Sequence, residues 1–411
     1  MQQTINMSAT FQYFLDLEEK HGAHNYHPLP VVLSKGEGVF LYDVDGKRYY
    51  DFLSGYSAVN QGHCHPKILK AFMEQAQKLT LTSRAFYNDQ LGEYEKYITE
   101  FFGYDKVLPM NTGVEAVETG IKLCRKWGYE VKGIEEGKAK IIVCEGNFHG
   151  RTTSVISFSS DPSATKNFGP YMPGFISIPY NDTKALAEAL VDKNIAGFLV
   201  EPIQGEAGVF VPDDGYLSKA KQMCEEAKVL FIADEIQAGL ARTGKMLACD
   251  HEDVRPDILL LGKALSGGMM PVSAVLCDDE IMMTIKPGEH GSTYGGNPLA
   301  SKVAIASLQI LKDEKLAEHA DAMGKLLRDE LKKINSPYIN IIRGKGLLNA
   351  ILIKHTNKDA AWELCMELME NGLLAKPTHG DKIRFAPPLI ITKDQILDCI
   401  GIISKSLKVL D

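Results

Sequence analysis

Short apolar runs alternate with helical patterns through the middle of the chain. The runs IIV, GFLV, VLFIA, ILLL and SAVL lie between residues 141 and 276, and segments such as KALAEALVD and LSKAKQMCEEA have a helical pattern. Fully apolar strands that alternate with helices are typical of a parallel sheet covered on both faces. The pattern therefore predicts an α/β fold built on a mostly parallel sheet.

The pattern changes after Pro298. Residues 300–334 predict one or two long helices, and short strands around LLNAILI and KIRFAP and a closing helix follow them. Near the start, VFLYDVDGKRYYDF predicts a hairpin that turns at Asp45-Gly46. A chain of 411 residues exceeds the roughly 250 to 300 residues of one usual core. We expect a large domain, a smaller α+β domain and an N-terminal segment packed with the latter: residues 51–300, 301–411 and 1–50.

Composition narrows the class of partner. Hydrophobic residues make up 45% of the chain and charged residues 24%, as in an ordinary soluble protein. The formal net charge of -8 argues against nucleic acid or an anionic membrane surface as partner. Apolar runs of about 18 residues, which a membrane span needs, are absent from the sequence. Small anionic substrates would have to bind to locally placed arginines.

The cysteines and the first residues bear on the compartment. The eight cysteines are scattered without a C-x-x-C pair, which favours reduced thiols. His63 and His65 flank Cys64, but no second ligand pair has a fitting spacing, so we expect no metal site. The chain has three acids and no Lys or Arg before Lys20, unlike a mitochondrial presequence. We expect a cytoplasmic protein, or a mitochondrial matrix protein if a presequence has been removed.

The segment from Val229 to Lys263 carries the clearest chemistry. VLFIA ends at Asp234, and ILLL is followed by Gly262 and Lys263, so an acid and a lysine stand at the ends of two successive strands. An acid in a dry cleft can keep a pyridine nitrogen protonated, and a lysine amine can form a Schiff base with an aldehyde. Pyridoxal phosphate (PLP) requires this pair, although either residue alone is more often structural.

A second segment, VLPMNTGVEAVETGIKLCRKW, offers a phosphate site. Thr112 and Glu115 form a capping box, which begins a helix, and Gly113 and Val114 lie in its first turn. Unpaired N–H groups and the helix dipole favour an anion there, although the same pattern also fits a capped helix without a ligand. The sequence has no G-x-G-x-x-G after a strand and no Walker lysine, so nucleotide cofactors lack support.

Taken together, these motifs resemble the class III family of fold-type I PLP-dependent aminotransferases, whose members act on terminal amines. The resemblance runs from about residue 20 to the C-terminus, and it is carried by GAHNYHPLPVVL, FLSGYSAVNQGHCHP, LTSRAFYN, VLPMNTGVEA, NFHGRT, VEPIQGEAGV, LLGKALSGG, KPGEHGSTYGGNPLA, RGKGLLNA and GLLAKPTHGDKIRFAPPL. It implies a large domain with a seven-stranded type of sheet and a smaller α+β domain. It also implies PLP as cofactor and a homodimer with shared active sites.

The resemblance also assigns roles in cofactor binding. Lys263 and Asp234 would be catalytic. The further cofactor-binding residues would be Gly113 and Val114 at the phosphate, Phe148 and His149 at the ring, Gln237 at the phenolic oxygen, and Ser292 or Thr293 at the phosphate of the partner subunit. Glu201 would not contact the cofactor but would support the residues that do.

The resemblance implies a ping-pong transfer of the δ-amino group of L-ornithine to 2-oxoglutarate. In the resemblance, Arg384 binds the α-carboxylate of glutamate and 2-oxoglutarate, and Arg151 binds the other carboxylate or that of ornithine. Glu206 would neutralise Arg384 while ornithine reacts. Tyr26 and Tyr56 match positions that orient ornithine.

Three alternatives remain open. The donor could be acetylornithine, lysine or 4-aminobutyrate; the enzyme could be an isomerase like glutamate semialdehyde aminomutase; or the chain could be a silent scaffold, which the presence of Lys263 and Asp234 disfavours. Two positions depart from or vary within the expected pattern: Ala238 stands where Thr often follows the Gln, and His149 varies among relatives. Both bear on rate or fine specificity only.

Overall fold

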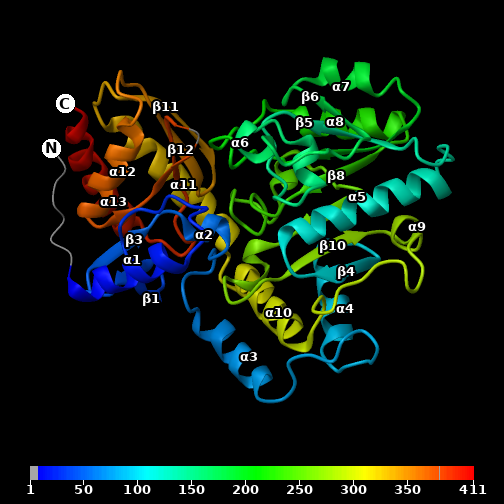
Figure 1. Cartoon of the computed structure of the whole chain (residues 1–411), viewed down its shortest axis with the longest axis horizontal. Helices are drawn as coiled ribbons and strands as arrows, with labels where there is room; N and C mark the ends of the chain where they lie inside the picture. Colours follow the sequence, from blue (N-terminus) through cyan, green and yellow to red (C-terminus); the bar gives the residue numbers. More distant parts are fainter. Residues whose placement is uncertain (1–7, 379) are drawn as a thin grey trace.

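The computed structural model describes residues 8–378 and 380–411. Residues 1–7, which belong to the expected N-terminal segment and to the presequence argument, and His379, in the motif GLLAKPTHGDKIRFAPPL, lie outside the described residues. The chain forms two lobes, and the described parts of both chain ends lie in the same lobe (Figure 1).

The larger lobe is built on a seven-stranded sheet with the order β4-β10-β9-β8-β7-β5-β6. Strand β10 runs antiparallel to its neighbours β4 and β9, and the other neighbouring strands are parallel. The strands are β4 (Lys106–Met110), β5 (Lys140–Cys144), β6 (Phe175–Ile178), β7 (Ile195–Val200), β8 (Leu230–Asp234), β9 (Ile258–Leu261) and β10 (Ser273–Cys277). The prediction of a mostly parallel seven-stranded sheet is confirmed.

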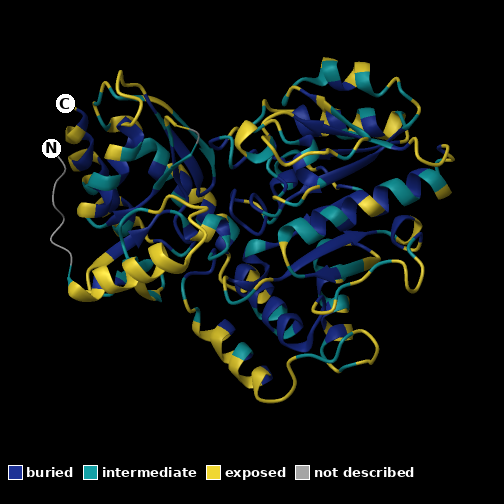
Figure 2. Cartoon of the chain, in the orientation of Figure 1, coloured by how far each residue is buried: buried dark blue, intermediate teal, exposed yellow. Residues whose placement is uncertain are grey.

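Helices cover both faces of this sheet, which explains why its central strands β7, β8 and β9 are apolar at almost every position. In β7, Phe198 packs in the cluster of α8 (Tyr216–Glu226), while Leu199 packs in the cluster of α5 (Gly113–Glu130). Since neighbouring strand residues point to opposite faces, both must be apolar when both faces are buried. The central strands are accordingly buried in Figure 2, whereas α1 and α3 are largely exposed.

The smaller lobe joins both ends of the chain. One sheet contains β1 (Leu33–Glu37), β2 (Phe40–Asp43), β3 (Arg48–Asp51) and β13 (Leu373–Leu374), and β13 pairs with β3 in parallel. The other has the order β11-β12-β15-β14 and comprises β11 (Ile339–Lys345), β12 (Leu348–Ile353), β14 (Lys376–Thr378) and β15 (Lys382–Phe385). The domain boundaries at 50 and 300 stay a prediction.

The remaining helices complete the two lobes. The longer ones are α1 (Ala9–His21), α3 (Pro66–Ala76), α4 (Leu91–Phe102), α7 (Thr183–Ala189), α10 (Pro298–Asp313), α11 (Leu316–Lys333), α12 (Ala360–Glu370) and α13 (Lys393–Ser406). The short ones are α2 (Ser54–Ser57), α6 (Pro162–Thr165), α9 (Asp279–Met282), η1 (Val155–Phe158), η2 (Ala248–Glu252), η3 (Lys263–Ser266) and η4 (Leu407–Leu410). Within the described ranges, no helix is both long and apolar enough to cross a membrane.

Candidate active site

Two neighbouring strands of the large sheet end in the residues that the sequence singled out. Asp234 is the last residue of β8, where it pairs with Leu260 of β9, and Lys263 follows β9 at the start of η3. Lys263 has a φ of 42°, a left-handed conformation that is strained for a residue with a side chain. Both side chains line a cavity of about 180 Å³, together with Gly113, Val114, Phe148, His149, Glu201 and Gln237.

The environment of Lys263 favours a neutral amine. Burial lowers its pKa, and the charge of Arg384 acts in the same direction, while Glu206 and Asp234 oppose the shift. Desolvation disfavours the ammonium form, and the free amine is the form that attacks a carbonyl carbon. The lysine is therefore set up as a nucleophile.

Asp234 is held by two hydrogen bonds. One carboxylate oxygen accepts from the N–H of Ile236 at 3.1 Å, and the other is 2.6 Å from Nδ1 of His149. Burial acts to lower the pKa of His149, but the hydrogen bond and the charge of Asp234 outweigh it and raise that pKa. The Nδ1–H thus donates to the Asp234 carboxylate and fixes its orientation. No hydrogen-bond partner within residues 8–378 and 380–411 contacts the buried Nε2.

Glu201 lies behind Phe148. Its Oε1 accepts a hydrogen bond of 2.8 Å from the N–H of Phe148, and burial raises the pKa of Glu201 to about 8. The carboxyl group is therefore mainly neutral at pH 7. It fixes the backbone that carries the Phe148 ring, without adding a full negative charge beside Asp234.

The start of α5 supplies an anion site next to Lys263. Thr112 accepts from the N–H of Glu115 at 3.4 Å, and the Glu115 carboxylate accepts from the N–H of Thr112 at 2.6 Å, so the predicted capping box is present. A Cβ placed on Gly262 would lie 3.6 Å from the Cα of Gly113, which shows how close this turn is to the lysine. The first turn of α5 can therefore bind a phosphate beside the reactive amine.

The segment that contains Ser292 and Thr293 lies on the same edge. The Nδ2 of Asn111, just before the capping box, donates to Ser292 Oγ at 2.8 Å within the same chain, whereas Thr293 is exposed. The expected contact of this segment with a partner subunit stays a prediction.

Arg384 and Glu206 form an ion pair next to Gln237, which lines the cavity. The guanidinium, of which only 3% of the side chain is exposed, donates to Glu206 Oε1 at 2.8 Å. Gln237 donates to the same oxygen at 2.9 Å and accepts from Arg384 at 3.1 Å. Burial acts to raise the pKa of Glu206, but Arg384 outweighs it and lowers that pKa. The expected contact of Gln237 with the cofactor's phenolic oxygen stays a prediction.

A left-handed turn places Tyr56 over Arg384. Residues Ser54–Ser57 have φ angles of 49°, 55°, 60° and 71°. Since this conformation costs roughly 1 to 2 kcal/mol for a residue with a side chain, the turn needs outside support. Asp51 accepts from two N–H groups at its start, and Ser54 Oγ donates to the carbonyl of Ala386 at 2.7 Å. The guanidinium of Arg384 consequently lies 5.0 Å from the Tyr56 ring centroid.

Arg151 and Tyr26 lie at the outer side of the site. The exposed Arg151 has its guanidinium 5.4 Å from the Phe148 ring centroid, and no acidic side chain in the described part of the chain pairs with it. Tyr26 is 70% exposed. Burial raises the pKa of Tyr56, and the nearby Glu206 and Tyr26 add to the rise. The site thus contains one paired arginine and one that is open to a ligand.

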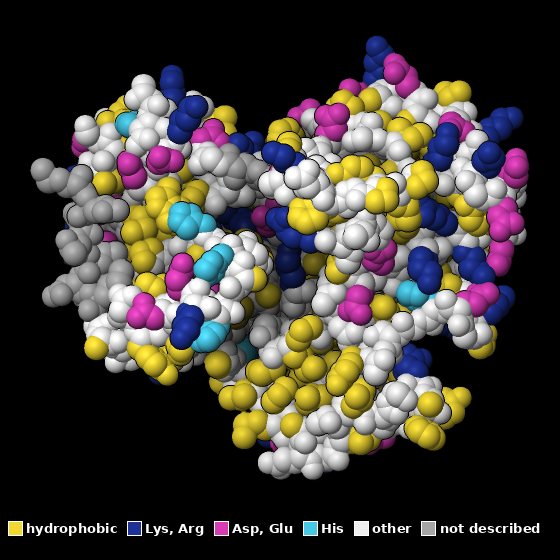
Figure 3. Space-filling view, viewed as in Figure 1, with side chains coloured by type: hydrophobic (Ala, Val, Ile, Leu, Met, Phe, Trp, Pro, Cys, Tyr) yellow, Lys and Arg dark blue, Asp and Glu magenta, His cyan; other side chains and the backbone are white. Residues whose placement is uncertain are grey.

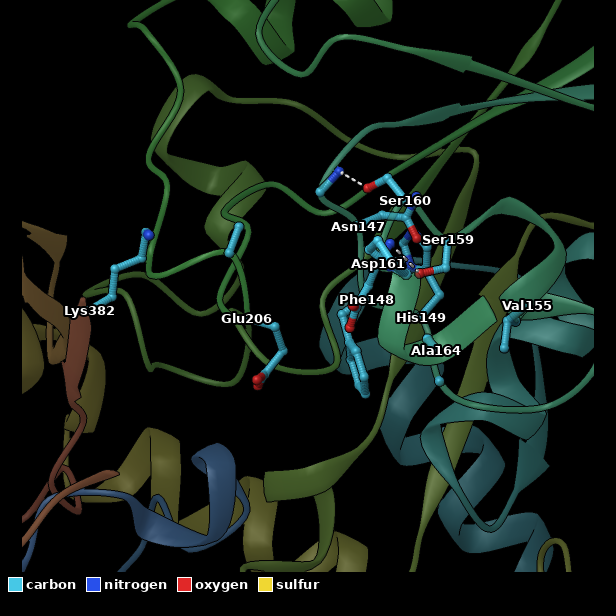
Figure 4. Close-up of a pocket in the computed structure, with 14 residues that line it drawn as sticks. Asn147, Phe148, His149, Val155, Ser159, Ser160, Asp161, Ala164, Glu206 and Lys382 are labelled. Atoms are coloured by element: carbon cyan, nitrogen blue, oxygen red, sulfur yellow. Dashed lines mark hydrogen bonds between the residues drawn. The ribbon is translucent and has the colours of Figure 1, made fainter. Parts of the chain in front are cut away.

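Sequence reasoning missed a second cavity, of about 310 Å³, that adjoins the first (Figure 4). Phe148 and His149 line both cavities, and Glu206 and Lys382 form the opposite wall. These residues come from segments far apart in the chain, so no local pattern marks the cavity. Lys and Arg side chains gather in the hollow between the lobes (Figure 3), which gives the acidic chain a locally positive site.

Pyridoxal phosphate fits the residues of the first cavity. The turn that can hold a phosphate, the carboxylate that can hold a ring nitrogen and the buried lysine all line the same space. These features define a PLP-dependent enzyme with an α/β fold.

Comparison with known proteins identifies the family. The model of the family "Aminotransferase class-III" matches residues 21–407. The mitochondrial ornithine aminotransferase of Rattus norvegicus is 63% identical over 96% of this chain and 90% of its own length. The chain therefore belongs to the class III aminotransferases and is a PLP-dependent transaminase.

Two solved structures have the same fold. The ornithine aminotransferase of Toxoplasma gondii, whose active site holds PLP at partial occupancy, superimposes with a TM-score of 0.95 and is 50% identical, covering 97% of this chain and 94% of that one. An acetylornithine aminotransferase of Elizabethkingia anophelis has a TM-score of 0.89 and is 61% identical, covering 97% and 99%. Proteins with this fold and a similar degree of identity therefore include enzymes named for different amine donors.

Proposed function

We propose that this aminotransferase moves the δ-amino group of L-ornithine to 2-oxoglutarate. The products are L-glutamate and glutamate 5-semialdehyde, which cyclises to pyrroline-5-carboxylate. The observation that supports this most is the contrast between the two arginines: Arg384 is buried and paired with Glu206, whereas Arg151 is exposed and open. Ornithine has one carboxylate, which needs one open arginine. 2-Oxoglutarate has two, so it needs a second arginine that can be released from its acid.

In the first half-reaction, ornithine presents its δ-amine to the cavity. Its α-carboxylate is then far from the reacting atom and suits Arg151, while Glu206 keeps Arg384 neutralised. Without that pair, the buried guanidinium would face an uncharged part of the donor and pay the cost of an unpaired charge.

In the second half-reaction, 2-oxoglutarate brings a carboxylate next to the reacting carbon. We assign this carboxylate to Arg384, after Glu206 has moved aside, and the distal carboxylate to Arg151. The planar guanidinium binds a carboxylate through two parallel hydrogen bonds, so the exchange of one carboxylate for another preserves the pairing of Arg384.

The chemistry is divided between cofactor and chain. Bound PLP supplies an aldehyde carbon and a ring that accepts electrons. Lys263 holds the cofactor, and its lowered pKa suits it to take a proton from the substrate carbon and to return it. Asp234, which accepts from the Nδ1–H of His149, would hold the proton of the ring nitrogen.

A panel of amine donors tests the proposed substrate. We expect kcat/KM with 2-oxoglutarate to be at least about tenfold higher for L-ornithine than for N-acetylornithine, L-lysine or 4-aminobutyrate, scored by the glutamate formed. A higher value for another donor would reassign the substrate. Conversion of an amine without consumption of 2-oxoglutarate would indicate an isomerase.

We further propose a homodimer in which Thr293 or Ser292 completes the phosphate site of the partner subunit. The exposure of Thr293, at the edge where α5 begins, supports this arrangement. Cytoplasm stays the proposed compartment, with the mitochondrial matrix as the alternative, because relatives of this identity are named mitochondrial.

A further inference from the structure

The loop that carries Arg151 is attached to the helix that begins the phosphate site. Glu118 lies on α5, and its Oε1 accepts hydrogen bonds from Thr152 Oγ1, at 2.5 Å, and from Ser154 Oγ. These two hydroxyl groups come from residues on the C-terminal side of Arg151, one and three positions away. A single carboxyl oxygen therefore binds the loop at two points.

The loop also packs directly on the first turn of α5. Gly150 has a φ of 127°, and a Cβ at this position would lie 2.4 Å from Cγ2 of Val114. Only glycine tolerates this approach and this conformation. Val114 and Glu118 are four residues apart and so share a face of the helix. That face contacts the loop just before Arg151 and just after it.

We propose that Glu118 is a positioning residue that fixes Arg151 and thereby sets the affinity for the substrate carboxylate remote from the reacting atom. This inference rests on the role given to Arg151 under the proposed function. Arg151 is exposed and has no acidic partner in the described ranges, so its own side-chain contacts do not fix its backbone. A loop that is ordered only when the ligand binds loses conformational entropy, which weakens binding. A loop that is already ordered avoids this loss.

Substrates with and without a carboxylate for Arg151 should respond differently to a displaced loop. L-Ornithine and 1,4-diaminobutane present the same terminal amine, but only ornithine has a carboxylate for Arg151. 2-Oxoglutarate and pyruvate differ in the same way, because pyruvate lacks the distal carboxylate. A loss of loop position should therefore weaken the binding of ornithine and 2-oxoglutarate and spare the two analogues that lack the carboxylate for Arg151.

Single-turnover kinetics of both half-reactions test this with Glu118→Ala and Glu118→Gln. We expect Glu118→Ala to weaken the apparent affinity for ornithine and 2-oxoglutarate by about tenfold, with little change in maximal rate. The rates with diaminobutane and pyruvate, and the dissociation constant of PLP, should stay within about twofold. Glu118→Gln should retain near wild-type affinity, because its amide oxygen can accept both hydroxyl groups.

Matched variants control for a general effect on α5. Glu130→Ala removes an exposed acid that pairs with Lys126 near the end of the same helix, and it should change neither substrate class. The pair Thr152→Val with Ser154→Ala should reproduce Glu118→Ala and should add little when combined with it, because both remove the same contacts.

Two outcomes overturn the inference: equal losses for all four substrates, or unchanged affinity in Glu118→Ala and in the double hydroxyl variant. Arg151→Ala keeps this separate from the proposed function. If Arg151→Ala itself leaves ornithine and diaminobutane equally affected, the role of Arg151 is wrong. If it lowers ornithine affinity selectively while the Glu118 variants do not, only the positioning role is wrong.

Discussion

The buried Arg384 donates a hydrogen bond of 2.8 Å to Glu206, a residue 178 positions earlier in the chain. The second arginine of the site, Arg151, lies against the Phe148 ring and is open to solvent. A buried guanidinium that loses its partner costs several kcal/mol, so Arg384 needs an acid or a substrate carboxylate at all times.

The first prediction concerns Lys263. Its lowered pKa and its position in the cavity predict that it forms the covalent bond to PLP. Reduction of the PLP-loaded protein with borohydride, followed by digestion and mass analysis, should place the cofactor on Lys263. Lys263→Ala should bind PLP without this bond and lose essentially all transaminase activity. Labelling of a different lysine would refute the assignment.

The second prediction concerns pH and Glu201. Burial raises the pKa of this group from 4.5 to about 8. The folded chain thus holds a proton there that the unfolded chain releases, so stability falls as pH rises from about 4.5 to about 8 and levels off above that. Glu201→Gln mimics the neutral acid and removes this dependence.

The measurement is the difference in Tm between Glu201→Gln and wild type. The Tm of Glu201→Gln minus that of wild type should rise between about pH 6 and about pH 8.5. The rise should correspond to at least about 1 kcal/mol in the free energy of unfolding. The exposed Glu136→Gln should show no such trend and serves as the control. A difference that stays flat with pH would mean that Glu201 is ionised in the folded protein.

The third prediction concerns the shared site. Thr293→Glu would place a negative charge at the phosphate of the partner subunit and should inactivate the protein. Mixing it with inactive Lys263→Ala should restore activity at up to about one quarter of the sites under random exchange, because each hybrid dimer has one intact site. If activity stays absent although exchange is demonstrated by mass, Thr293 does not serve the partner subunit.

Elements with a local cause could be predicted from the sequence. The strand β8 is an apolar run that ends at Asp234, and α5 begins at a capping box, so both boundaries follow from neighbouring residues. Strand β11 (Ile339–Lys345) was not predicted, because its pattern NIIRGK mixes polar and apolar residues without a clear period. Its position is set by pairing with β12 rather than by propensity.

Features of the site with distant causes could not be predicted from local patterns. The segment SGYS contains one glycine, and nothing in it indicates four successive left-handed residues. Asp51, which itself pairs with His63 at 2.7 Å, and Ala386 impose that conformation. The contacts of Glu118 and the pairing of Glu206 with Arg384 likewise join segments that only the fold brings together. The resemblance to a family suggested the pairing of Glu206 with Arg384 but gave no indication of the Glu118 contacts.

In the proposed mechanism, Glu206 neutralises Arg384 while the donor reacts and moves away from Arg384 when the acceptor carboxylate binds. Glu206→Ala should therefore slow the ornithine half-reaction by about tenfold or more, because the buried guanidinium is left unpaired. The same variant should leave the glutamate half-reaction equal or faster, since no pair has to open. Glu206→Gln, which retains a hydrogen-bond acceptor without the charge, should lie between Glu206→Ala and wild type for ornithine.

Arg384→Ala should have the opposite effect, with a loss of about a hundredfold for glutamate and 2-oxoglutarate and a smaller loss for ornithine. Stopped-flow absorbance follows each half-reaction separately, as the bound cofactor gains the amino group or loses it. The most direct measurement is the ratio of the ornithine to the glutamate half-reaction rates in Glu206→Ala. This ratio should fall by about tenfold or more relative to wild type. Equal slowing of both halves, with an unchanged ratio, would show that Glu206 is a structural support and that selectivity lies elsewhere.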